Sequence, residues 1–468
     1  MSRSSSLIRS LHSPRLAVWL IVYLVGYAAL VTLVPQEGVV SPSDLAAWRA
    51  ANPSLSAFIT ALDLHRAFWS VAFVAPAVLL ALSTAVCAWA RTRAARNMGL
   101  MARAASGDVA ARVTARPHET VAAEDGVEAL QRVAEVADSL GLRVTVDAGT
   151  LRATHALWAV WGSPVFHWAL VGLFLATGIG QALKWEGQLG VPVGHSVTDG
   201  PLSYGSILRG PLGPAEPSTG LTVAVPDMPL EYRAGEVERG HAPLVRLMSG
   251  DQIVAERRVY PNSPLMYGPL YFHREAWGLA VVAALETSAG AEVGRRNFLI
   301  EIGSTGGTGR LGIDDGMPPE SGVSAIRFDV PLDPTAGGFV ADVPDDPRVE
   351  VGVPGSSEIQ TTTLRPGGAI TFPGGELTLR VVDVTRYVRL LVVHDPSTPV
   401  VYTFFVLAVL GCAVALLVHP RILVAVERRR DDGTVVADVV VLSARVDTLF
   451  ASRARETLAR IGVRKGES

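Results

Sequence analysis

One histidine, His167, lies inside the apolar stretch 156–183 (ALWAVWGSPVFHWALVGLFLATGIGQAL), which contains no Asp, Glu, Lys or Arg. Ionisable side chains are costly at membrane depth and usually serve a function there. An imidazole can transfer a proton or ligate a metal ion, and it is a common axial ligand of haem iron. The alternative is a structural histidine that is hydrogen-bonded to a neighbouring helix or lies in the headgroup zone. The sequence therefore predicts that His167 either binds a ligand or packs inside a membrane.

The depth of His167 follows from the position of Pro164. Proline is favoured in the first turn of a helix, and a helix from Pro164 to Leu183 spans roughly 30 Å at a rise of 1.5 Å per residue. His167 then lies one turn from the inner end of the helix, between Trp161 and Trp168, which are typical interfacial residues. A ligand can be received from the inner leaflet at this depth.

One face of the same helix is predicted to pack closely. Trp168, Gly172, Ala176 and Gly180 recur at four-residue spacing, and the last three form a small-xxx-small pattern that lets helices approach each other. We expect this face to contact another span and name it as a candidate surface for a partner, while His167 faces a groove. Glycine is also common in membrane helices without such a role, which is the alternative interpretation.

Four apolar runs define the organisation of the chain. They are 16–34, 67–90, 156–183 and 396–418, and none contains Asp, Glu, Lys or Arg. Each is near or above the roughly 20 residues that a helix needs to cross ~30 Å of hydrocarbon. The first run is too long for the apolar region of a signal peptide, and the VPQEG that follows it lacks a small-x-small cleavage site. The sequence therefore predicts four transmembrane helices.

The placement of arginines predicts the side of the membrane that each segment occupies, because positively charged residues are retained in the cytoplasm. Arginines flank the inner ends of the spans: Arg3, Arg9, Arg15, Arg91, Arg93, Arg96, Arg152, Arg421, Arg428, Arg429 and Arg430. The loop between the first two spans carries only Arg49 and Arg66. The predicted segments are a cytoplasmic N-terminus (1–15), an external loop (35–66), a cytoplasmic loop (91–155), an exported domain (184–395) and a cytoplasmic C-terminal β-hairpin and helix (419–468).

The segments outside the spans differ in their patterns. Alternating runs such as TGLTVAV and DQIVAERRVY, separated by Gly and Pro, predict that 184–395 is a β-rich, sandwich-like domain. The loop 91–155 combines an amphipathic helix with a strand, after an Ala- and Arg-rich part (97–120) that we expect to be a linker. Because an isolated hairpin is marginally stable, we expect this loop and 419–468 to pack into one small α+β cap in the cytoplasm.

Several classes of function are disfavoured by what the sequence lacks. The net charge of −3 gives no indication of nucleic acid binding. The two cysteines, Cys87 and Cys412, lie in apolar runs, so the chain has neither the CxxC of a thiol reductase nor the CxxCH of a c-type cytochrome. No catalytic residue is predicted, and the histidines outside the spans show no metal-ligand spacing: His65, His195, His241, His273 and His394. Four spans without buried charge pairs or inverted repeats argue against a transporter.

Five stretches carry a resemblance to a known family. In chain order they are LVTLVPQ, LDLHRAFWSVAFVAPAVLLALSTAVCAWAR, SPVFHWALVGLFLATGIG, RVYPNSPLMYGPLYFHREAWG and YVRLLVVHDPSTPVVYTFF. Their order and spacing around four spans resemble the ResB membrane proteins of System II cytochrome c biogenesis. The chain departs from the family pattern at Ser397, where the family has glycine after Asp-Pro, and at His273, Arg274 and Glu275, where it has small polar residues.

The resemblance implies a non-catalytic subunit in the bacterial plasma membrane. Its partner would be the tryptophan-rich multispan haem-handling protein, whose WG-x-x-W-x-WD motif is absent here because WAVWG (158–162) stops short. Together they would bind haem transiently, with His167 as an axial ligand, and move it outward to apocytochrome c, which a thioredoxin-like thiol reductant keeps reduced. Apart from that haem iron, no metal is expected. Two alternatives stay open: a membrane-anchored exported β-domain that acts as a sensor or scaffold, and a transporter accessory subunit.

Overall fold

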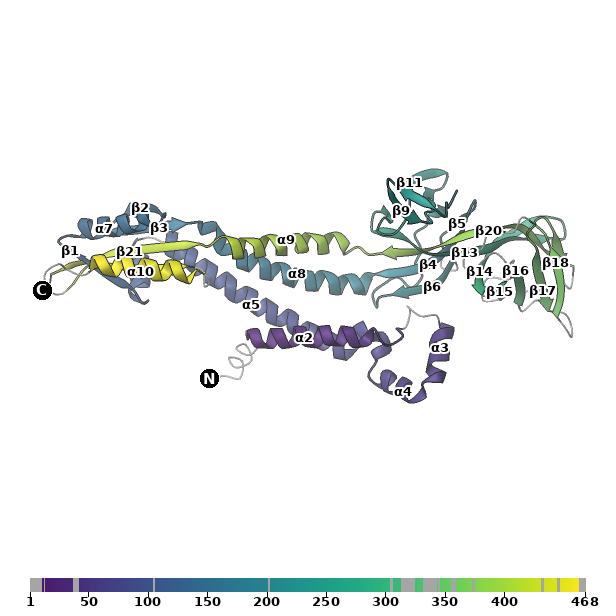
Figure 1. Cartoon of the computed structure of the whole chain (residues 1–468), viewed down its shortest axis with the longest axis horizontal. Helices are drawn as coiled ribbons and strands as arrows, with labels where there is room; N and C mark the ends of the chain where they lie inside the picture. Colours follow the sequence, from purple (N-terminus) through teal and green to yellow (C-terminus); the bar gives the residue numbers. More distant parts are fainter. Residues whose placement is uncertain are drawn as a thin grey trace. The chain divides into compact units, whose positions relative to one another are not determined.

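The computed structural model describes residues 11, 13–36, 42–103, 106–200, 203–303, 306–312, 325–330, 343, 346–354, 359–372, 375–430, 433–443 and 447–462. Most of the N-terminal segment 1–15 lies outside the described residues. The chain divides into two compact units (Figure 1): Met1–Thr177 together with Pro399–Ser468, and Gly178–Thr398.

Four of the described helices are long and apolar enough to cross a membrane. They are α2 (Pro14–Val31), α5 (Val71–Arg103), α8 (Gly162–Leu183) with the preceding 3₁₀ turn η2 (Leu157–Trp161), and α9 (Thr398–Leu417). Many of their large apolar side chains are exposed, as expected of surfaces that face lipid and not water. The prediction of a membrane protein with four apolar helices and a β-rich domain is confirmed.

The second of these helices continues well beyond its apolar run. α5 has 33 residues, which is about 50 Å at 1.5 Å per residue. The end of α5 and the following α6 (Ser106–Thr114) bury apolar side chains on a sheet: Met101, Ala102, Val109 and Val113. The expectation that 97–120 is a linker is therefore wrong, because the few apolar residues of this Ala- and Arg-rich segment find partners in the sheet.

The loop between the first two spans is also helical in its described part. It contains α3 (Pro42–Ala51), α4 (Pro53–Ala61) and the 3₁₀ turn η1 (Leu64–Trp69). The hydroxyl groups of Tyr27 in α2 and Ser70 at the end of η1 are 2.6 Å apart. This hydrogen bond joins α2 to the residue that directly precedes α5.

A five-stranded antiparallel sheet occupies the first unit, in the order β1-β22-β21-β3-β2. Its strands come from two distant parts of the chain: β1 (Glu119–Ala123), β2 (Arg143–Asp147), β3 (Thr150–His155), β21 (Arg421–Arg429) and β22 (Val435–Ser443). Helices α7 (Gly126–Ser139) and α10 (Thr448–Gly462) share one core with the sheet, which includes Leu423 and Ala425. Ile422 and Val424 point to the opposite core with α5 and α6. Both faces of β21 are thus covered, which explains its unbroken apolar sequence.

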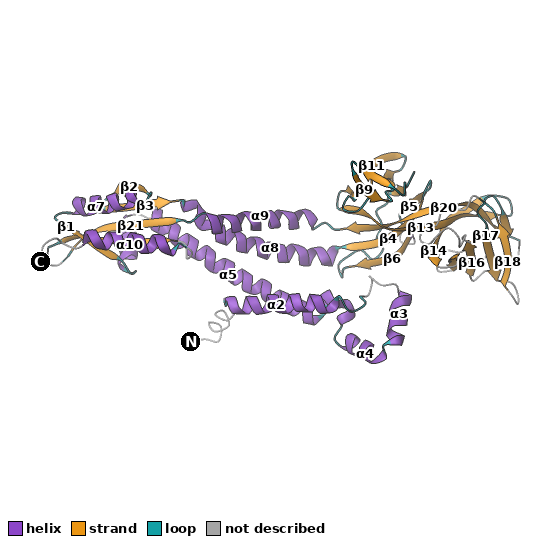
Figure 2. Cartoon of the chain, in the orientation of Figure 1, coloured by secondary structure: helices purple, strands orange, loops and turns teal. Residues whose placement is uncertain are grey.

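The second unit is built almost entirely of antiparallel strands, apart from the helix ends (Figure 2). One long path has the order β18-β17-β16-β15-β14-β13-β20-β4-β6, and a second sheet has the order β11-β10-β7-β5. The strands of the path are β4 (Trp185–Pro192), β6 (Tyr204–Arg209), β13 (Leu270–Thr287), β14 (Glu292–Gly303), β15 (Gly306–Gly312), β16 (Ala325–Val330), β17 (Val349–Pro354), β18 (Ile359–Leu364) and β20 (Leu377–His394). The second sheet contains β5 (Ser196–Thr198), β7 (Thr222–Ala224), β10 (Leu244–Ser249) and β11 (Gln252–Arg258), and the short pairs add β8 (Tyr232–Ala234), β9 (Val237–Gly240), β12 (Leu265–Tyr267) and β19 (Ala369–Thr371).

Two cores follow one another along the paired strands β13 and β20. At one end, Phe272 and Leu390 pack with Leu247 of the smaller sheet, so that two sheets face each other as in a sandwich. At the other end, Val281 and Val381 pack with residues of β17 and β18 from the same long path. The β-rich character was predictable, and these two consecutive cores were not.

Candidate functional site

The helix that carries His167 begins with a change of helix type. The 3₁₀ turn η2 ends at Trp161, and α8 begins at Gly162, so that Pro164 lies in the first turn of the α-helix. Proline is tolerated there because the first backbone N–H groups of a helix have no intrahelical acceptor. His167 consequently lies in the second turn of α8, near its N-terminal end.

The imidazole of His167 makes one hydrogen bond, and it is to its own helix. Nδ1 lies 2.7 Å from the carbonyl oxygen of Ser163, four residues earlier. A carbonyl can only accept, so Nδ1 carries the proton and the lone pair remains on Nε2. Among the described residues, Nε2 makes no hydrogen bond. Metal-binding histidines usually donate their second ring N–H to a carbonyl or carboxylate in this way.

The surroundings of the ring agree with a site that is partly open. His167 is half-buried, and the ring of Phe166 lies edge-on to it with the centroids 5.2 Å apart. No neighbouring helix in the described part of the chain donates to or accepts from the imidazole. The structural alternative of a histidine that links two helices by a hydrogen bond is therefore not the geometry found here.

The predicted packing face of α8 contacts other helices of the same chain. Trp168 Nε1 donates to Thr92 Oγ1 of α5 over 3.0 Å. Gly172 lies against the ring of Phe404 in α9, and Gly180 lies against the side chain of Ser397. Ala176, between these two glycines, is buried. The small residues at Gly172 and Gly180 thus make room for side chains of this chain.

A second close approach was not found from the sequence. A Cβ atom on Gly411 of α9 would lie 2.6 Å from the backbone nitrogen of Phe166, and one on Gly162 would lie 2.8 Å from that of Ala415. The backbones of α8 and α9 therefore nearly touch at the turn that carries His167. Gly411 is an isolated glycine in its span, so its spacing gave no signal of this contact.

The other histidines at this end of the chain belong to the sheet. His155 is the last residue of β3, where it pairs with Arg421 of β21, and His419 lies two residues before the start of β21. His155 is exposed. Within the described residues, no group of three or more His, Cys, Asp or Glu side chains could hold a metal ion. His167 differs from these histidines in lying inside an apolar helix with Nδ1 hydrogen-bonded to a carbonyl.

The histidines of the second unit are engaged with protein groups. His195 Nε2 lies 2.9 Å from Asp383 Oδ2, and the His394 ring stacks on Trp185 with the centroids 6.0 Å apart. Burial, with a smaller contribution from the nearby charge of Arg274, lowers the pKa of His241 to about 4. His195 thus also donates one ring N–H, to a carboxylate, but unlike His167 it lies in the β-rich unit and not in an apolar helix.

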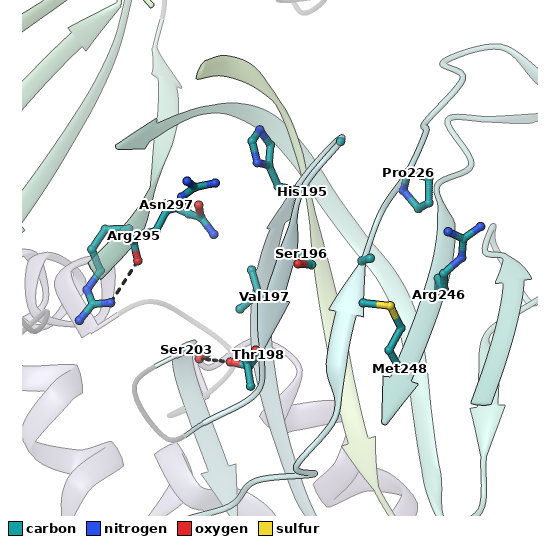
Figure 3. Close-up of a pocket in the computed structure, with 13 residues that line it drawn as sticks. His195, Ser196, Val197, Thr198, Ser203, Pro226, Arg246, Met248, Arg295 and Asn297 are labelled. Carbon is teal, nitrogen blue, oxygen red and sulfur yellow. Dashed lines mark hydrogen bonds between the residues drawn. The ribbon is translucent and has the colours of Figure 1, made fainter. Parts of the chain in front are cut away.

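A polar groove of about 790 Å³ also lies in the second unit (Figure 3). It is lined by Gly194, His195, Ser196, Val197, Thr198, Ser203, Ala224, Pro226, Arg246, Met248, Arg295, Arg296 and Asn297. Arg246 pairs with Glu256 at 2.6 Å and Arg295 with Glu292 at 3.0 Å, which neutralises two of its guanidinium groups. Its polar walls suit a polypeptide or another polar molecule better than a large apolar macrocycle.

The fold and the site together define a membrane protein with four apolar helices, a β-rich domain and a histidine inside its third apolar helix. The ResB-like family model matches residues 15–304 and 319–453, and the chain belongs to this family. The resemblance seen in the sequence motifs is thereby confirmed. The chain is 26% identical over 427 residues to cytochrome c biogenesis protein CcsB of Synechococcus sp. (strain WH7803), covering 87% of each protein. It is 23% identical over 423 residues to the CcsB of Synechococcus sp. (strain CC9311), covering 86% of this chain and 85% of that protein.

Proposed function

We propose that this protein is the ResB-like component of a System II cytochrome c synthase complex, which receives haem near the inner face of the membrane through His167 and helps to move it outward. The observation that carries the proposal is the imidazole in α8 whose Nδ1 is held by Ser163 and whose Nε2 is open. Family membership and the name of the CcsB relatives support the pathway. Haem is the cargo of the protein in this account, and not a resident cofactor.

The proposed topology places the termini and the five-stranded sheet in the cytoplasm and 184–395 outside. The arginines at the inner ends of the spans support this orientation. In this orientation His167 lies near the cytoplasmic side, where newly made haem is available. The small sheet, with both faces covered by helices, forms a compact cytoplasmic cap.

The proposed partners follow from what this chain lacks. Its described thiols are Cys87 in α5 and Cys412 in α9, both in apolar helices, so a thioredoxin-like protein has to reduce the apocytochrome. One imidazole supplies one axial ligand, so the tryptophan-rich haem-handling protein has to supply the second. The chain therefore acts as a non-catalytic subunit, and expressed without this partner it should support no attachment of haem to apocytochrome c. Because Gly172 and Gly180 contact this chain itself, we infer that the partner binds a different face of the spans.

A second candidate function is that of an exported scaffold, in which the helices serve only to anchor the β-rich unit. The polar groove beside β5 is the observation that favours it. In that case His167 would be dispensable, whereas the groove residues would not. The two functions are therefore separable by substitution of His167.

The experiment replaces the chromosomal gene by variants in a host that depends on this system, and measures haem-stained c-type cytochromes. His167→Ala should abolish them, while protein level and recovery of the partner stay unchanged. His155→Ala is the matched control, because His155 is an exposed imidazole at the end of β3, and it should behave as wild type. Normal cytochrome levels in His167→Ala would refute the proposed function and leave the scaffold alternative.

A further inference from the structure

A side-chain hydrogen bond joins α5 to α8. The indole N–H of Trp168 donates to the hydroxyl of Thr92 over 3.0 Å. Ala88 and Ala95, which lie on the same face of α5 as Thr92, are 0% and 4% exposed. α5 therefore presents the face 88/92/95 to its neighbours in the helical unit, with Thr92 directly against the residue that follows His167.

Arg91 precedes Thr92 in α5. As Thr92 contacts Trp168, the preceding residue Arg91 lies at the same crossing of α5 and α8 as His167. Arg91 is exposed. In the part of the chain that the structure describes, no carboxylate forms an ion pair with it. A cation thus lies at the same helix crossing as the imidazole, and no described carboxylate pairs with it.

Arg91 and His167 both lie near the inner ends of their apolar segments. Arg91 is the first charged residue after the apolar run 67–90, so it lies at the end of the hydrocarbon, where a long side chain can reach the headgroup layer. His167 precedes Trp168, whose indole contacts Thr92, so it lies at about the same level of the helix crossing as Arg91. The pair therefore offers a ligand for a metal and a cation beside it, near the inner edge of the apolar layer.

Haem likewise combines a metal ion with anionic groups at one edge. Its iron lies at the centre of an apolar macrocycle, and its two propionate carboxylates project from one edge. Guanidinium matches carboxylate in a planar, bidentate geometry, and such charge-assisted hydrogen bonds are about twice as strong as neutral ones. A haem with its iron on His167 would direct its anionic edge to the inner membrane surface, where Arg91 lies.

We propose that Arg91 binds a propionate of the haem that His167 ligates, and so fixes the orientation in which haem is taken up. This inference rests on the proposed function, since it concerns the same cargo. Two attachment points define the plane and the direction of the macrocycle, whereas a single iron–imidazole bond leaves it free to rotate. Arg91 is then a binding residue that orients the cargo and does not ligate the metal.

The test compares two probes on the purified complex of this chain with its partner: iron protoporphyrin IX and its dimethyl ester, which lacks the carboxylate charges. The wild-type complex should prefer the free acid by about tenfold or more, as expected for loss of a hydrogen bond to a charged group. Arg91→Ala should lose this preference and keep its affinity for the ester, and Arg91→Lys should recover only part of it. The absorption spectrum that reports imidazole ligation should be the same in all three proteins.

Arg93→Ala is the matched control, because Arg93 is an exposed arginine of the same helix two positions further on. It should keep the wild-type preference. A wild-type ratio in Arg91→Ala, or an equal loss in Arg93→Ala, would overturn the inference. Failure of the proposed function has a different signature: His167→Ala would then keep the wild-type haem spectrum, whatever the ratio of the two probes.

Discussion

Two half-buried histidines, His167 in α8 and His241 in the β-rich unit, show what makes an imidazole able to ligate. The His167 ring donates from Nδ1 to a carbonyl, which leaves the lone pair of Nε2 open. The guanidinium of Arg274 lies against the ring of His241, and because it can only donate, it occupies the one ring nitrogen of the neutral imidazole that can accept. The same side chain thus has one ring nitrogen without a described hydrogen bond at His167, whereas at His241 the accepting nitrogen is occupied. The two histidines differ in what contacts the ring nitrogen that can accept a hydrogen bond, and not in burial alone.

In the proposed topology His167 lies near the cytoplasmic side of the membrane and His241 lies outside. Alkaline phosphatase fused after Ser54 or Gly290 should be active, and after Ala122 or Ser468 inactive, because this enzyme matures only after export. The difference in phosphatase activity between the two pairs of fusions should be all-or-none. Activity of the fusion after Ala122 would place the start of α8 on the outer side, and His167 could then not receive haem from the cytoplasm.

The position of His167 can be disturbed without touching its side chain. In Gly411→Ala the three atoms nearest to the new Cβ would all be backbone atoms, at 2.6 to 3.0 Å, among them the nitrogen of Phe166. Such overpacking should destabilise the complex by about 1–3 kcal/mol, although Ala is otherwise favoured over Gly in helices by about 1 kcal/mol. Haem per complex should also fall.

The control for this variant is Gly178→Ala in α8, because a Cβ on Gly178 has no atom within 4 Å. This substitution should leave haem content and melting temperature at or above the wild-type values. If Gly411→Ala melts and binds haem like Gly178→Ala, the close crossing of α8 and α9 does not hold His167 in place.

His241 should affect stability at acidic pH and leave haem binding alone. Its pKa is lowered to about 4 by burial and by Arg274, so between about pH 6.5 and pH 4 the unfolded chain binds more protons than the folded one. The melting temperature should therefore decrease as the pH falls through this range. His241→Gln should show a smaller decrease between pH 7 and pH 5, with haem content unchanged; an unaltered pH dependence would contradict the assignment.

The sequence predicted the four apolar helices because lipid imposes a length and a composition that each run displays on its own. It also singled out His167, because an ionisable residue stands out in an apolar run. The end of α5 at Arg103 was not predictable, since hydropathy reports the apolar part of a helix and not the turns that pack on a sheet. The contact of Gly411 with Phe166 and the acceptor role of the Ser163 carbonyl depend on tertiary structure and on the backbone, and neither leaves a pattern in the side chains.

The most direct test of the account is the absorption spectrum of the haem bound to the purified complex, with and without His167. His167→Ala should lose most of the bound haem and the six-coordinate, low-spin spectrum, and added imidazole should restore both by entering the vacated position. A packing histidine would show no such rescue. If the His167→Ala complex holds haem with the wild-type spectrum in the absence of imidazole, His167 is not an axial ligand and the central claim is wrong.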